Sequence, residues 1–128
     1  MGVRIFTSPR IRKELGETDL QSVVEKFRKY KESGDHQDFF GRDVTFDRPQ
    51  SVVFAGLEHV HLNAGSPWGL RLLQIRRKSD KHLVYCKGFF KSDCFLLITL
   101  VMRAHERYRN DLYMLDLADI GSAFRSKY

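Results

Sequence analysis

Hydrophobic residues in this chain recur first at helical spacing, then at strand spacing, and at helical spacing again near the end. Before the first helix, residues 3–7 alternate between polar and apolar side chains, which is typical of a short strand. Ser8 followed by Pro9 predicts a helix that begins at Pro9, because serine caps helix starts and proline fits the first helical position. Ile11 lies on the apolar face of this predicted helix, and Gly16 ends it.

A longer helix is predicted between residues 18 and 34. Thr18-Asp19-Leu20-Gln21 matches a capping box, which predicts Thr18 as the N-cap residue. Apolar side chains then recur at helical spacing at Leu20, Val23, Val24, Phe27 and Tyr30. Gly34 is expected to end the helix. Residues 35–56 follow no regular period and are punctuated by glycine and proline, so we expect irregular structure there.

After residue 56 the hydrophobic period becomes two. Strands are predicted over residues 57–62, 70–77, 82–87 and 95–102. In the first of these, alternation places Val60 and Leu62 on one face of the sheet, with His59 and His61 on the other. The end of the chain returns to helical spacing, with an apolar stripe of Tyr113, Leu117, Ile120 and Phe124.

Strands grouped in this way predict an α+β fold in one domain over residues 1–128. We expect an antiparallel sheet with the N-terminal helices packed on one face and a C-terminal helix. The helices are expected to cover only one side of the sheet, which would leave the other side free to bind a ligand.

Composition indicates a globular chain that stays in the cytoplasm. The longest strongly apolar run, residues 95–102, is far shorter than the ~20 residues that cross a membrane. The N-terminus lacks a secretory signal pattern. We therefore expect no contact with membranes.

Positive charge is concentrated in one segment of the chain. Residues 51–110 hold ten Lys or Arg against four Asp or Glu, which accounts for the whole net charge of +6. Four of the five histidines lie in the same segment. A basic block that also carries histidines indicates a surface that meets phosphates, although a solvated basic face without a ligand is the alternative.

Histidine and arginine are the side chains that RNA cleavage without a metal requires. Imidazole can move protons near neutral pH, and guanidinium can neutralise the charge that grows on the phosphate. His105 lies among several arginines just past the last predicted strand, and His82 opens the strand before it. The predicted catalytic residues are His105, His82, Arg103 and Arg109. The predicted RNA-binding residues are His59, His61, Arg71, Arg76, Arg77, Lys78, Tyr85, Lys87, Arg107 and Tyr108.

Metal, cofactor and nucleophile chemistry have weaker support in the sequence. His59 and His61 point the same way on one strand, but no Asp, Glu or Cys lies at a spacing that would complete a zinc site. We therefore predict no metal and no cofactor. The sequence also contains no Gly-x-Ser-x-Gly motif and no glycine-rich phosphate loop.

Several motifs resemble the YafO family of type II toxins. They begin with Tyr30-Lys31-x-x-Gly34, Phe40-Gly41-Arg42-Asp43 and His59-x-His61-Leu62. They continue with Gln74-x-x-Arg77-x-x-Asp80-x-His82-Leu83-Val84-Tyr85-Cys86-x-Gly88, and end with His105, Arg109, Met114 and Ile120-Gly121. The resemblance covers nearly the whole chain. Residues 40–43 have no chemistry that we can derive, and we interpret them as a glycine turn with a local Arg–Asp pair, with contact to an antitoxin or the ribosome as the alternative.

The resemblance implies a RelE/ParE-like fold and a ribosome-dependent, metal-independent endoribonuclease that cleaves mRNA and inhibits translation. It also implies a cognate antitoxin similar to YafN as a partner, beside the ribosome and mRNA. In that group a basic residue precedes Leu-Val-Tyr, a place held here by His82, and a His or His-Tyr follows the last strand. Glu106 follows His105 here, which leaves Tyr108 as a candidate for stacking on a base. Two alternatives stay open: a ParE-like inhibitor of DNA gyrase without enzymatic activity, and an RNA- or ribosome-binding protein without catalysis.

Overall fold

The computed structural model describes residues 2–63, 68 and 72–128. Within them the elements are, in chain order, β1 (Arg4–Thr7), α1 (Pro9–Glu14), α2 (Glu17–Ser33), β2 (Phe40–Thr45), α3 (Gln50–Phe54), β3 (Leu57–Leu62), the 3₁₀ turn η1 (Gln74–Arg76), β4 (Lys81–Lys87), β5 (Cys94–Met102), α4 (Ala104–Arg107) and α5 (Asp111–Arg125). No helix among the described residues is long and apolar enough to cross a membrane.

The strands form one mixed sheet in the order β1-β5-β4-β3-β2. The α+β class is confirmed, but the prediction of a purely antiparallel sheet was wrong. β1 pairs in parallel with β5, whereas the other neighbours pair antiparallel. The helices α1 and α2 separate β1 from β2 along the chain and place these two strands at opposite edges. The alternation of apolar residues predicts which face of the sheet a residue occupies, but it does not predict whether neighbouring strands run parallel or antiparallel.

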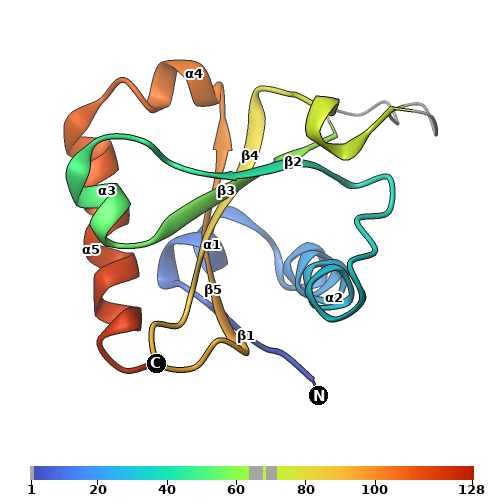
Figure 1. Cartoon of the computed structure of the whole chain (residues 1–128), viewed down its shortest axis with the longest axis horizontal. Coiled ribbons are helices and arrows are strands. Elements are labelled where there is room, and N and C mark those ends of the chain that lie inside the picture. The colour runs from blue at the N-terminus through green and yellow to red at the C-terminus, as the bar shows by residue number, and fades with distance from the viewer. Residues whose placement is uncertain (1, 64–67, 69–71) are drawn as a thin grey trace.

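Helices pack on both faces of the sheet, with α2 on one side and α5 on the other (Figure 1). One core joins Ile11 of α1 and Phe27 of α2 to one sheet face, and a second core joins Val52 of α3 and Leu117 of α5 to the other. The expectation of a free sheet face was therefore wrong. The strands carry apolar residues on both faces, and each face needs a cover to keep those side chains from water.

The helix ends follow the sequence in part. Ser8 caps α1, and its Oγ accepts a hydrogen bond from the Ile11 N–H at 3.1 Å, as predicted. Gly34 ends α2 with a φ of 77°, the left-handed conformation in which glycine is favoured. The predicted cap at Thr18 was wrong, because α2 begins at Glu17 and its N-cap residue is Gly16.

Two segments differ from the predicted pattern. The predicted strand over residues 70–77 lies partly outside the described residues, and its described part contains η1 instead. Leu73 and Ile75 are 66% and 60% exposed there, so these apolar side chains mark no buried face. Residues 35–56, expected to be irregular, contain β2 and α3. β2 was missed because a register irregularity between Phe40 and Asp43 breaks its alternation.

Gly41→Ala is expected to lower the free energy of unfolding by about 1–3 kcal/mol, the usual cost of overpacking. A Cβ atom at Gly41 would lie 2.3 Å from the Arg77 carbonyl oxygen, which also accepts a hydrogen bond from the Arg42 N–H. Chemical denaturation measures the change. Gly16→Ala is the matched control, because its added Cβ atom would have no neighbour within 4 Å. Equal stability losses in the two variants would contradict the close approach at Gly41.

Candidate functional site

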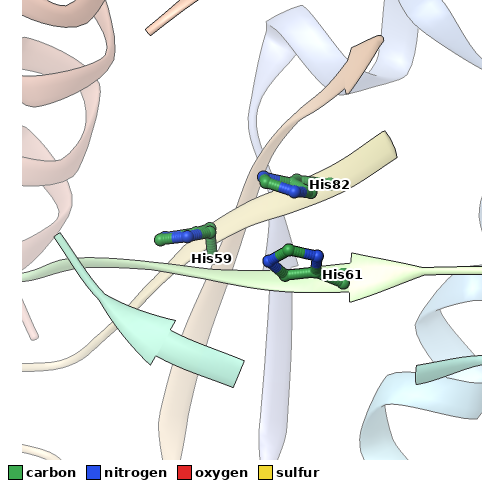
Figure 2. Close-up of side chains that lie close together, drawn as sticks. All are labelled: His59, His61 and His82. Carbon is green, nitrogen blue, oxygen red and sulfur yellow. The ribbon is translucent and has the colours of Figure 1, made fainter. Parts of the chain in front are cut away.

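Three histidines gather on the α5 face of the sheet, at the end of β3 and the start of β4. His59 and His61 lie on β3, and His82 of β4 is paired directly opposite His61 (Figure 2). The ring centroids of His61 and His82 are 3.9 Å apart, and those of His59 and His82 are 5.1 Å apart. We call these three residues the histidine cluster. The predicted placement of His59 and His61 opposite Val60 and Leu62 is confirmed. Val60 and Leu62 belong to the α2-side core, whereas the His59 ring centroid lies 4.2 Å from that of Phe46 in the α5-side core.

Ser79, in the segment before β4, fixes the protonation of two of these rings. Its carbonyl oxygen accepts a hydrogen bond from His82 Nε2 at 2.9 Å, which requires a proton on that nitrogen. Its N–H donates to His61 Nδ1 at 2.8 Å, so that nitrogen carries a lone pair. His82 Nδ1 is then free to accept the hydrogen bond from the Tyr108 hydroxyl at 2.8 Å. The buried Nδ1 of His59 has no partner among the described residues.

Burial keeps the histidine cluster uncharged at neutral pH. Loss of solvent, together with repulsion from neighbouring cationic groups, lowers the pKa of His59 to about 3 and that of His61 to about 4. Burial also lowers the pKa of His82. The positive charge of this region therefore comes from arginines and not from these imidazoles.

A hollow of about 390 Å³ opens beside the histidine cluster and brings cationic side chains from separate segments together. Among its lining residues are Arg42, Arg48, His59, His105, Tyr108 and Arg109. We call it the cationic hollow. β2 supplies Arg42, β3 supplies His59, and the α4 region supplies His105, Tyr108 and Arg109. His105 is exposed, and its main-chain N–H donates to Asp80 Oδ1 at 2.9 Å, which holds the start of α4 against the loop before β4.

The basic run at residues 103–109 does not act as one group. Of its members, His105, Tyr108 and Arg109 line the cationic hollow, whereas Arg103 and Arg107 line a different one with Met102, Glu106 and Asn110. The Arg107 guanidinium carbon lies 5.4 Å from the ring centroid of Tyr113. A helix turns its side chains through a full circle in 3.6 residues, so neighbours in sequence point in different directions.

Several predicted site residues are buried and cannot reach a substrate directly. Tyr85 is fully buried on the α2 side, where its hydroxyl bonds to Asp43, and Arg77 is 4% exposed with its guanidinium donating to the carbonyls of Leu72 and Gln37. Their predicted role in RNA binding stays a prediction that this structure does not support, because protein groups already use their polar atoms. His82 and His61 are 2% and 7% exposed, so the predicted direct contact of either ring with RNA is not possible in this structure.

The remaining predicted residues lie elsewhere on the surface. Arg76 and Lys78 are exposed in the segment that leads into β4. Lys87 is exposed at the opposite end of β4 from His82, about 16 Å along the strand. Arg71 lies outside the described residues.

Sequence reasoning missed two arginines of the cationic hollow. Arg42 stood in the motif Phe40-Gly41-Arg42-Asp43, to which no chemistry was assigned, and Arg48 carried no signal in its irregular segment. Alternation along β2 could have placed Arg42 on the face of His59, because Val44, two residues on, pairs with His59. The register irregularity hid this pattern.

The same motif also belongs to a largely buried polar network on the α2 face. Asp43 accepts hydrogen bonds from the hydroxyls of Tyr30 and Tyr85, each at 2.6 Å, and pairs with Lys31 at 3.1 Å. Gln74 donates to both the Tyr30 hydroxyl and the Gly41 carbonyl at 2.9 Å. Asp43 therefore pairs with Lys31 and not with Arg42 as expected. Burial is the main cause that raises the pKa of the Tyr30 and Tyr85 hydroxyls, which keeps them protonated as donors.

Comparison with known proteins decides the family. A family model described as toxin YafO of type II toxin–antitoxin systems matches residues 28–126. The chain belongs to the YafO toxin family. The mRNA interferase toxin YafO of Escherichia coli (strain K12) is 32% identical over 132 residues, which cover 98% of this chain and all of that protein. No solved structure matches. The resemblance in the sequence motifs is thus confirmed, and membership of the YafO family implies an antitoxin as a partner.

Proposed function

We propose that this YafO family chain is an endoribonuclease that cleaves mRNA on the ribosome, inhibits translation in the cytoplasm and is neutralised by a cognate antitoxin similar to YafN. The name of the relative, an mRNA interferase toxin, supports the reaction class. We further propose that the mixed sheet, with its helices on both faces, is a RelE/ParE-like fold. The observation that carries the proposal is the cationic hollow, which joins three arginines to two histidines and a tyrosine.

The cationic hollow matches the charge of a phosphodiester. Arg42, Arg48 and Arg109 present guanidinium groups from three separate segments, and Asp47 is the acidic residue among its lining side chains. Guanidinium binds phosphate oxygens through paired hydrogen bonds and keeps its charge at any physiological pH. These arginines would bind the scissile phosphate and neutralise the charge that grows on it during cleavage.

Cleavage proceeds by attack of the 2′-oxygen of the RNA on the adjacent phosphorus. The bond from phosphorus to the 5′-oxygen breaks, and the products end in a 2′,3′-cyclic phosphate and a 5′-hydroxyl. One proton leaves the attacking 2′-hydroxyl, and one reaches the departing 5′-oxygen. We assign one of these transfers to His105, the exposed imidazole of the cationic hollow. The other proton is exchanged with solvent water. His105, the arginines and water therefore account for both transfers and for the charge on the phosphate, and the scheme includes no bound metal.

His82 acts through Tyr108 in this proposal and not on the RNA. The His82 ring, held by the Ser79 carbonyl, accepts the Tyr108 hydroxyl and fixes the position of a tyrosine that lines the cationic hollow. An aromatic ring at that place can stack on a base next to the scissile phosphate. Arg76 and Lys78, both exposed, are proposed to contact the RNA or ribosome around the site.

Pulsed expression of the chain is expected to arrest growth and to leave mRNA with discrete breaks in phase with codons. Mapping of mRNA 5′ ends, with and without the antitoxin gene, tests this. The new 5′ ends should accept an adapter only after phosphorylation in vitro, because the reaction leaves a 5′-hydroxyl. Coexpressed antitoxin should remove both the arrest and the breaks.

The alternatives give different results in the same experiment. Arrest with intact mRNA and linearised plasmid would instead support an inhibitor of DNA gyrase. Ribosome binding without arrest would support an RNA-binding protein that lacks catalysis. Breaks that carry a 5′-phosphate would contradict the proposed attack by the 2′-oxygen.

A further inference from the structure

The histidine cluster has the ligand set of a metal site, which spacing along the sequence did not reveal. The pair His59 and His61 offered only two ligands, and β4 brings His82 beside them. One ligand nitrogen from each of the three rings lies within 4.8 Å of the other two. Three histidines are a known protein ligand set for zinc, as in carbonic anhydrase, where the fourth position of the ion stays open.

The hydrogen bonds of the cluster suit coordination at two of the three rings. His82 donates its Nε2–H to the Ser79 carbonyl, which is the support that histidine ligands commonly have, and so presents the lone pair of Nδ1 to its surroundings. The buried Nδ1 of His59 has no partner among the described residues. An ion bound through this nitrogen would supply one.

We propose that His59, His61 and His82 form a binding site for one divalent cation that prefers nitrogen ligands, with zinc as the representative ion. This site is separate from the chemistry proposed for RNA cleavage. Imidazole suits zinc, copper and nickel, whereas magnesium prefers oxygen ligands and is not expected to bind here. His59 also lines the cationic hollow, so an ion can enter the cluster from that side.

Binding would exchange two hydrogen bonds for coordination bonds. A metal on His82 Nδ1 displaces the Tyr108 hydroxyl, which donates to that nitrogen in the metal-free protein. Coordination by His61 ends the bond from the Ser79 N–H, because Nδ1 then either holds the metal or carries the proton. The nearby positive charge of Arg42 opposes a cation, and the carboxylate of Asp80 favours one. We therefore expect an affinity below that of closed structural zinc sites.

Calorimetric titration of the untagged, metal-stripped chain with Zn²⁺, in the absence of RNA and ribosomes, tests the site. One ion should bind per chain with a dissociation constant below about 10 µM, and Mg²⁺ should not bind. His59→Gln should weaken zinc binding by about 100-fold or more, because it removes the partly exposed ligand of the set. His105→Ala is the matched control: it removes an exposed histidine outside the set and should leave the affinity for zinc unchanged.

Nuclear magnetic resonance of the imidazole nitrogens provides a second readout that does not depend on a variant folding. Zinc should shift one nitrogen of His59, His61 and His82 in the wild-type chain, together with the Ser79 amide, and leave His36 in place. No saturable binding, an equal loss in His105→Ala, or shifts confined to exposed histidines would overturn the proposal. Cleavage of mRNA should persist with a zinc-selective chelator that leaves ribosomal magnesium bound. The metal site and the nuclease proposal can therefore fail independently.

Discussion

Replacing His105 by alanine is expected to lower the rate of mRNA cleavage by about 10²- to 10⁴-fold, the usual contribution of a general acid or base. The side chain lines the cationic hollow, and its loss removes an imidazole placed beside Arg42 and Arg109. The fold should not change, because α4 is held through the main-chain N–H of His105 and not through its ring. Single-turnover cleavage of mRNA on purified ribosomes measures the rate.

Arg107→Ala is the matched control for this prediction. Arg107 lies two residues from His105 and is also exposed, but it lines the other hollow beside α4. Its loss should change the rate of the chemical step by less than about threefold, in keeping with the modest effects of charges at the rim of a binding surface. Wild-type cleavage by the His105 variant would refute its assigned role. Equal losses in both variants would indicate that the basic run acts only by its charge.

Asp43→Ala is expected to lower the free energy of unfolding by about 3 kcal/mol, the lower end of the cost of removing one partner from a buried ion pair, because this pair is largely but not fully buried. The carboxylate accepts two tyrosine hydroxyls and pairs with Lys31, and its side chain is 13% exposed. Alanine leaves the Lys31 ammonium and both hydroxyls without this acceptor, in a place that little water reaches. Denaturation with urea, followed by circular dichroism, measures the change.

Asp35→Ala serves as the control, since Asp35 also pairs with a lysine but at the surface. The distance from Asp35 Oδ2 to Lys29 Nζ is 3.7 Å, and the side chains are 47% and 64% exposed. Water screens such a pair, so its loss should cost less than about 1 kcal/mol. If both variants lost the same stability, the network around Asp43 would not be the stabilising feature that its burial indicates.

The regular elements were predicted where local chemistry alone defines them. Ser8 caps α1 through its own side chain, and Gly34 ends α2 because glycine adopts a positive φ without a steric cost. Strands β3, β4 and β5 alternate or run apolar over enough residues to show their period. At α2 the predicted N-cap residue, Thr18, and the observed one, Gly16, differ by two positions. Element boundaries depend on such small differences.

The candidate site was predicted only in its residue types. The sequence indicated histidines and arginines as the chemical groups, and it singled out His105 and Arg109, which do line the cationic hollow. Closeness in sequence to these residues did not place the other arginines in the site. Arg103 and Arg107 line another hollow, and the buried Arg77 donates to a main-chain carbonyl. Arg42 and Arg48 lie far from His105 along the chain. No local sequence pattern predicts that the folded sheet brings Arg42 and Arg48 to the same hollow as His105.

By itself the sequence determined the family, the order of most helices and strands, the face occupied by His59 and His61, and the stock of cationic groups. These properties depend on short stretches of chain, because the hydrophobic period of a helix or strand and the capping of a helix involve only residues a few positions apart. The tertiary structure alone decided that β1 runs parallel to β5, that both sheet faces are covered, and that His82 is buried against Tyr108 with its pKa lowered. Strand direction, burial and the choice of neighbours arise from contacts between distant residues, and the pKa of a histidine depends on what those contacts exclude.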